Sequence, residues 1–126
     1  MKKIIFYSYL KCSTCRKASN WLDKFGFAYQ LIDIVKEPPS MEYLNLAFEQ
    51  YSGDKKKVFN TRGKAFKSIN LDITSLSREE IFKLLLSEGK LIKRPFLVYE
   101  EKKVILGFNE IEYLNNLCKF KKTSIS

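Results

Sequence analysis

A Cys-x-x-Cys motif between a strand-like run and a helix-like run restricts the fold of this chain more than any other feature. Residues 3–7 are β-branched and aromatic, which favours a short buried strand. The motif Cys12-Ser-Thr-Cys15 follows, and a helical apolar periodicity then continues until Gly26. Residues 27–34 are again strand-like. So short a β-α-β unit predicts parallel strands joined by a right-handed crossover helix. The apolar residues of that helix are Ala18, Trp21, Leu22 and Phe25.

The rest of the chain predicts a helical stretch, a β-hairpin and a last helix. Ser40 can cap one helix, and Ser77 with Glu80 matches a capping box for another, which we expect to end at Gly89. Residues 96–99 and 104–106 favour an antiparallel hairpin. The helix after Ser40 has the apolar face Met41, Leu44, Phe48 and Tyr51. Asn109 caps the last helix, whose apolar residues are Ile111, Leu114 and Leu117.

The resulting order is β-α-β, a helical insertion and β-β-α. With a Cys-x-x-Cys between the first strand and first helix, this order is typical of a thioredoxin-like α/β fold with a mixed four-stranded sheet. The chain has 126 residues, which suits one core. We expect a single domain at 1–118, with the helical insertion at about 40–90, followed by a polar basic tail at 119–126.

Composition excludes several functional classes. Histidine is absent, which rules out catalysis by a Ser-His-Asp or Cys-His arrangement and any His-ligated zinc. No apolar run approaches the roughly 18 residues that a bilayer span needs, and the first apolar stretch breaks at Ser8, too early for a signal peptide. Three cysteines, an odd count, argue against a disulfide framework. The sequence therefore predicts a cytoplasmic protein without a membrane partner.

The net charge of +9 predicts attraction to anions, nucleic acid or acidic protein surfaces, or simply a lysine-rich solvated surface. No helix carries a dense basic stripe, and no ribonucleoprotein motif is present. We therefore expect no direct sequence-specific contact with nucleic acid. The lysine-rich surface favours a monomer.

Cys12 and Cys15 are the candidate catalytic residues. Cys12 falls where a strand meets a helix, and there the free N–H groups and the helix dipole stabilise a thiolate. Cys15, one turn on, can attack a mixed disulfide on Cys12 and release the product. Two alternatives stay open, a zinc half-site and a pair of unrelated buried cysteines. Zinc would need further ligands from Cys118 and carboxylates, and Cys118 itself is expected to be a small core residue.

Only four arginines occur beside nineteen lysines, and arginine suits bidentate binding of an oxyanion. Arg16, Arg62 and Arg94 are candidate anion-binding residues, although each could also be an ordinary surface or ion-pair arginine. Arg78, in the first turn of a capped helix, is expected to face solvent. Pro95 precedes an apolar strand and is a candidate cis-proline.

Landmarks spread over the whole chain resemble the arsenate reductase (ArsC) family of the glutaredoxin-coupled type, together with its Spx- and MgsR-like relatives. They comprise Cys12-Ser-Thr-Cys15-Arg16-Lys17-Ala18, Glu37-Pro38-Pro39-Ser40, Phe59-Asn-Thr-Arg62-Gly63-Lys64, Lys93-Arg94-Pro95 and Leu106-Gly107-Phe108-Asn109-Glu110.

This resemblance implies a thiol-dependent oxidoreductase with Cys12 as nucleophile, arginines that hold a small oxyanion or disulfide substrate, and Pro95 as the cis-proline facing the active cysteine. It implies no bound cofactor or metal, with glutathione, glutaredoxin or thioredoxin as electron donor. Cys15 acts as the resolving thiol in this interpretation.

Two features instead resemble the Spx-type regulators. Cys15 supplies a partner for a disulfide switch, and Leu106-Gly107-Phe108 stands where arsenate reductases place an arginine. In that alternative, Gly53 matches the position at which Spx-type proteins contact the C-terminal domain of the RNA polymerase α subunit. Unlike Spx, this chain follows Gly53 with Asp54 and then three lysines.

Overall fold

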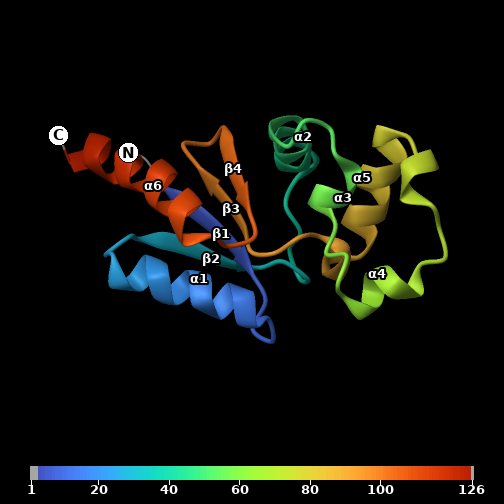
Figure 1. Ribbon diagram of the computed structural model, residues 1–126, viewed down its shortest axis with the longest axis horizontal. Coiled ribbons are helices and arrows are strands. Elements are labelled where there is room, and N and C mark those ends of the chain that lie inside the picture. Colours follow the sequence, from blue (N-terminus) through green and yellow to red (C-terminus); the bar gives the residue numbers. More distant parts are fainter. Residues whose placement is uncertain (1–2, 126) are drawn as a thin grey trace.

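The computed structural model describes residues 3–125 and follows the predicted order of β-α-β, a helical stretch and β-β-α (Figure 1). The strands are β1 (Ile4–Ser8), β2 (Tyr29–Asp33), β3 (Phe96–Tyr99) and β4 (Lys103–Leu106). The α-helices are α1 (Ser13–Lys24), α2 (Met41–Gln50), α3 (Lys55–Val58), α4 (Lys64–Ser68), α5 (Arg78–Ser87) and α6 (Glu110–Ile125). Two short 3₁₀ turns are η1 (Ile73–Ser75) and η2 (Gly89–Leu91).

The four strands form one mixed sheet in the order β2-β1-β3-β4. β1 runs parallel to β2, with Ile4 opposite Tyr29, and antiparallel to β3, with Ile4 opposite Tyr99. β3 and β4 form the predicted antiparallel hairpin, in which Phe96 lies opposite Leu106. This is the mixed four-stranded α/β arrangement that the sequence predicts.

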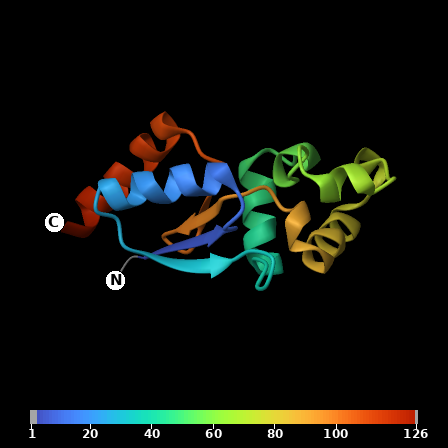
Figure 2. The ribbon, with the colours of Figure 1, turned by 90° about the horizontal axis from the view of Figure 1, so that it is seen from below.

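Side chains alternate between two cores, one on each face of the sheet. On one face, Phe6 and Leu97 pack with residues of α1 and α6, including Trp21 and Tyr113, whose rings meet edge to face at 5.5 Å. The other face is covered by α2 and the rest of the insertion. Figure 2 shows α1 and α6 together above the sheet, with α2 to α5 extending beyond one end of it. The first core therefore fixes α1, which carries the cysteine motif.

The caps of the insertion helices are confirmed. The Ser40 hydroxyl accepts a hydrogen bond from the Tyr43 amide at 3.2 Å. Ser77 and Glu80 form a complete capping box, with each side chain accepting from the other's backbone N–H. The predicted stop at Gly89 is confirmed, because α5 ends at Ser87 with Glu88 as its C-cap, and Gly89 then begins a separate 3₁₀ turn.

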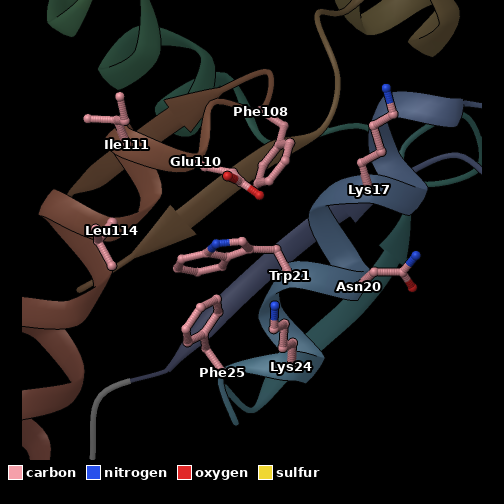
Figure 3. Close-up of a pocket in the computed structure, with 9 residues that line it drawn as sticks. All are labelled: Lys17, Asn20, Trp21, Lys24, Phe25, Phe108, Glu110, Ile111 and Leu114. Atoms are coloured by element: carbon pink, nitrogen blue, oxygen red, sulfur yellow. The ribbon is translucent and has the colours of Figure 1, made fainter.

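The predicted apolar faces of the helices are partly wrong. In α6, Tyr113 and Leu117 occupy the core, whereas Ile111 is 68% and Leu114 is 47% exposed. Ile111, Tyr113 and Leu114 lie within four positions of one another, so the 3.6-residue period of a helix does not by itself show which of them face the core. Figure 3 shows Leu114 beside the Trp21 indole, at a hollow of about 530 Å³ between α1 and α6. Three further residues also miss the core, because Phe25 and Met41 are exposed and Cys118 is half-buried.

Within the described residues, none of the helices combines the length and hydropathy that crossing a bilayer requires. α6 runs through Ile125 and so extends into the segment expected as a polar tail, 119–126. Ser126 lies outside the described residues.

Candidate active site

Cys12 is the N-cap residue of α1. Its backbone is extended, its N–H donates to the Tyr9 carbonyl at 3.0 Å, and its Sγ accepts a hydrogen bond from the Cys15 N–H at 3.3 Å. The sulfur thus takes the place that a Ser or Asp oxygen usually fills at the start of a helix. No acidic residue lies in the first turn of α1, so the positive end of the helix dipole acts on this sulfur without competition.

The surroundings of Cys12 lower its pKa from 9.0 to about 5. The largest cause is the hydrogen bond from the Cys15 thiol, and the Cys15 backbone N–H adds to it. Arg94 contributes both a hydrogen bond and its charge, while partial burial acts in the opposite direction. Cys12 is therefore a thiolate at neutral pH, and its side chain is only half-buried.

Cys15 has the opposite character. It is buried at 1% exposure, and its pKa is raised, first by donating its thiol proton to Cys12 and then by burial. Hydrogen bonds with the Tyr9 backbone and the Ser8 side chain only partly offset these effects. Neither of the two cysteines is in a disulfide. The two sulfurs thus share one proton, with the charge on the more accessible one.

Arg94 is the arginine that the structure brings to Cys12. Its Nη1 donates to the Lys90 carbonyl at 3.2 Å, and its guanidinium lies 5.0 Å from the centroid of the Tyr9 ring. The Arg94–Pro95 peptide bond is cis, and the Pro95 carbonyl accepts from the Gly107 N–H at 2.9 Å. A planar cation is therefore positioned beside the thiolate by a carbonyl and an aromatic face.

Tyr9 and Lys90 belong to the site, but their positions in the sequence did not predict it. Lys90 contributes a backbone carbonyl, for which its side chain gives no signal. Tyr9 contributes a ring that contacts a guanidinium 85 positions later in the chain, so local spacing could not reveal the pair. Only its nearness to Cys12 in the sequence offered a hint.

Arg16 and Arg62 occupy other positions. Arg16 is exposed on α1, and its Nη1 donates to the Leu10 carbonyl at 2.9 Å. Arg62 lies in the exposed turn before α4 and lines a hollow of about 850 Å³. The other cations at that hollow are Lys56, Lys57 and Lys93. The three predicted anion-binding arginines thus lie in three places. Arg94 lies at the thiolate, Arg16 contacts the loop before α1, and Arg62 lines a separate basic hollow.

Gly53 lies in the turn between α2 and α3. Its φ is +70°, directly after Ser52 at +60°, and its N–H donates to the Phe48 carbonyl at 2.8 Å. Two consecutive left-handed residues end α2 sharply, and glycine adopts this conformation at low cost. A Cβ at Gly53 would still have ordinary space, at 3.6 Å from the Phe48 ring.

The chain is similar to proteins of one family. The ArsC family model matches residues 7–116. YusI of Bacillus subtilis (strain 168) is 42% identical over 115 residues, which cover 90% of this chain and 97% of YusI. The global transcriptional regulator Spx of Lactiplantibacillus plantarum is 32% identical over 109 residues, covering 86% of this chain and 82% of Spx.

A crystal structure described as a possible arsenate reductase from Streptococcus mutans UA159 has the same fold. It is 39% identical, with a TM-score of 0.81, over 91% of this chain and 99% of that chain. The family match includes both cysteines, Arg94 and Pro95 within one continuous region. The chain therefore belongs to the ArsC family.

Proposed function

We propose that this protein is a thiol-dependent oxidoreductase, with Cys12 as the nucleophile and Cys15 as the resolving thiol. The observation that carries this proposal is the asymmetry of the pair. Cys12 is an accessible thiolate capping α1, while Cys15 lies buried behind it with its proton retained. A nucleophile and a second thiol within hydrogen-bond distance are what a two-step exchange requires.

In the first step with a disulfide, the Cys12 thiolate attacks one sulfur and the other sulfur leaves as a thiolate. The mixed disulfide removes the negative charge from Cys12, and with it the main cause that raises the pKa of Cys15. Cys15 then loses its proton to the departing sulfur or to solvent and attacks Cys12. The second substrate sulfur leaves, and the two electrons have passed from the cysteine pair to the substrate.

The same pair can reduce a small oxyanion such as arsenate. The Cys12 thiolate attacks the arsenic and displaces an oxygen, which departs as water after protonation. The Cys15 thiol then attacks the Cys12 sulfur, and the arsenic leaves as arsenite. Two thiols become one disulfide while the arsenic centre gains two electrons. Arg94 would offset the repulsion between the thiolate and an approaching anion, and Arg16 and Arg62 are the further candidates for binding it. Glutathione, glutaredoxin or thioredoxin would return the enzyme to its reduced state.

Mass spectrometry of the reduced protein after addition of glutathione disulfide tests the proposed chemistry. We expect wild type to lose two hydrogen atoms and gain no glutathione, because Cys15 resolves the adduct and the electrons pass to glutathione disulfide. Cys12→Ser should remain unchanged. Cys118→Ser is the matched control and should behave as wild type. A parallel assay with arsenate, glutathione and glutaredoxin determines whether the oxyanion is a substrate. Reaction of Cys12→Ser at the wild-type rate would refute the assigned nucleophile.

A second candidate function is a redox-sensing regulator that binds the C-terminal domain of the RNA polymerase α subunit. The turn at Gly53 and the similarity to Spx favour it. Co-purification of the two proteins, with oxidised and reduced wild type, tests this candidate. Gly53→Arg should abolish binding, while Gly53→Asn, which tolerates a positive φ, controls for backbone strain. Absence of binding in both redox states would exclude the regulator.

A further inference from the structure

A small hollow adjoins the loop that carries Cys12, on the side of the edge strand β2. It measures about 310 Å³ and lies between the loop before α1, the exposed side of α1 and β2. Tyr9 and Leu10 line it, and Cys12 is hydrogen-bonded to the Tyr9 carbonyl. The hollow therefore adjoins the loop that holds the nucleophile, two residues along the chain from Cys12. Its volume is at the lower limit of roughly 300 Å³ for ligand pockets, which suits one or two side chains.

Two exposed leucines border this hollow from opposite elements. Leu10 is 87% exposed in the loop, and Leu31 is 65% exposed on β2. A single exposed leucine is unremarkable, but two at one hollow next to a reactive thiolate provide an apolar contact surface. Such a surface contributes nothing to holding a small oxyanion. It matches instead an apolar side chain that flanks the reacting sulfur of a larger substrate.

The charged residues that line the hollow are Arg16 and Asp33. Arg16 uses one of its five N–H donors for the Leu10 carbonyl. Lys11 is exposed next to Leu10, whereas Lys17 lines the separate hollow between α1 and α6. Asp33 is the acidic residue at the hollow, and its Oδ1 already accepts from the backbone N–H groups of the following turn. The remaining donors of Arg16, with Lys11 exposed beside Leu10, therefore favour a carboxylate on the partner.

We propose that this hollow is the specificity site of the thiol chemistry. It takes peptide or protein disulfides in which the reacting cysteine has an apolar and an acidic side chain nearby. The apolar side chain lies between Leu10 and Leu31, and the carboxylate pairs with Arg16. An extended peptide advances at most about 3.6 Å per residue, so residues one to three positions from the cysteine extend up to roughly 11 Å from it. This inference rests on the proposed function and names its substrate class.

The reaction is the exchange described above, with the peptide held during the first step. The Cys12 thiolate forms a bond to the peptide sulfur, and the other half of the disulfide leaves as a thiolate. Cys15 then gives up its proton and displaces the peptide thiolate from Cys12. The protein ends with a Cys12–Cys15 disulfide, and an external dithiol of the thioredoxin or glutaredoxin class reduces it again.

The test compares rates with pentapeptides that carry a central cysteine activated as its 5-thio-2-nitrobenzoate disulfide, whose coloured leaving group reports the attack. Acetyl-Asp-Leu-Cys-Leu-Asp-amide is the preferred probe. In a second probe, Ser replaces both Leu residues. In a third probe, Lys replaces both Asp residues. We expect wild type to react with the preferred probe about tenfold faster than with either of the others, a difference of about 1.4 kcal/mol in barrier.

The variants separate the two contributions. Leu10→Ser with Leu31→Ser should abolish the preference for Leu, and Arg16→Gln should abolish the preference for Asp over Lys. Each preference is a ratio measured within one variant, so a change in the intrinsic reactivity of Cys12 cancels. Leu71→Ser and Arg78→Gln, at exposed sites elsewhere, are the matched controls and should keep both preferences.

The outcomes distinguish this inference from the function on which it rests. Equal rates with all three peptides in wild type, or preferences that persist in the variants, would overturn the specificity site. If Cys12 still attacks bis(2-hydroxyethyl) disulfide and forms the Cys12–Cys15 bond, the oxidoreductase proposal survives that result. If it attacks neither the peptides nor this small disulfide, both proposals fail.

Discussion

The backbone N–H of Cys15 lies 3.3 Å from the Sγ of Cys12, and the Cys15 thiol donates its own proton to the same sulfur. One residue therefore supplies two hydrogen bonds to the thiolate, and that residue is also the thiol placed to resolve it. Any change in the charge on Cys12 consequently alters the ionisation of Cys15. Both the pKa of Cys12 and the resolution of a mixed disulfide on it therefore depend on Cys15.

The thiolate absorbance of Cys12 should titrate with a pKa of about 5 in the reduced protein. Cys15→Ala should raise that pKa, because it removes the hydrogen bond that is the largest lowering cause. Arg94→Gln should also raise it, since it removes a hydrogen bond and a positive charge. Ultraviolet titration of each variant, with Cys12→Ser to identify the signal, makes the comparison. A midpoint near that of a free thiol in wild type would contradict the prediction.

Cys15→Ser should trap the mixed disulfide that wild type resolves. With glutathione disulfide, this variant should retain one glutathione on Cys12, whereas wild type should form the intramolecular bond. Intact-mass spectra followed by peptide mapping distinguish the two products. Equal glutathione on both proteins would show that Cys15 does not resolve the adduct.

Much of the fold could be predicted because its signals are local. The capping box at Ser77 and Glu80, the cap at Ser40 and the alternation within strands each depend on residues a few positions apart. The choice among Ile111, Tyr113 and Leu114 depends instead on which side chain faces the Trp21 ring, so it required the three-dimensional structure.

The features of the site also divide into those that local sequence predicts and those that depend on contacts distant in the sequence. The motif predicted a helix N-terminus at Cys12 and a second thiol one turn on, because both follow from helix geometry. The separation of Arg62 from Arg94 could not be predicted, since it depends on how the turn before α4 packs against η2. Tyr9 and the Lys90 carbonyl position Arg94 through contacts that no local pattern encodes.

Ionisation of Cys12 should make the reduced protein more stable as the pH rises from about 5 to 9. In this range the unfolded chain holds a proton on Cys12 that the native state has lost, since the native pKa is about 5 and the reference value is 9.0. The contribution is complete above the unfolded pKa and disappears as the pH falls through the native one. Cys15, whose pKa is raised, has the opposite effect, but only above about 9.

Urea unfolding with a reductant that keeps the thiols free measures this dependence. The matched control is Cys12→Ser, because serine is also a good N-cap residue and does not ionise in this range. The difference in unfolding free energy between wild type and Cys12→Ser should grow in favour of wild type from about pH 5 to about pH 8. A constant difference would show that the native state does not favour the thiolate.

Gly89→Ala should destabilise the fold strongly. A Cβ at Gly89 would lie 2.3 Å from the Ile34 carbonyl oxygen and 2.9 Å from the Val35 Cα, both backbone atoms that cannot rotate away. Overpacking of this kind costs about 1–3 kcal/mol, and a backbone clash should fall at the upper end. Gly63→Ala is the matched control, because its closest clash, at 2.6 Å, is with the flexible Asn60 side chain. Equal losses of unfolding free energy would contradict the distinction between the two sites.

Tyr51→Phe should weaken the attachment of the helical insertion to the sheet. The Tyr51 hydroxyl accepts from the Leu106 N–H at 2.9 Å, and the neighbouring Gln50 side chain donates to the Lys102 carbonyl and accepts from the Val104 N–H. These side chains form hydrogen bonds with backbone groups on the outer edge of β4. No further strand lies beside that edge in the described sheet. Phenylalanine keeps the ring but leaves the buried Leu106 N–H without this acceptor.

The expected loss for Tyr51→Phe is about 1–3 kcal/mol of unfolding free energy, the cost of leaving a buried donor unsatisfied. Tyr29→Phe is the matched control, because the Tyr29 hydroxyl donates to Asp23 at the exposed surface and its removal should cost at most about 0.5 kcal/mol. Hydrogen exchange localises the effect, since the Leu106 amide should exchange faster in Tyr51→Phe while amides in β1 change less. Unchanged protection at Leu106 would contradict the role assigned to the Tyr51 hydroxyl.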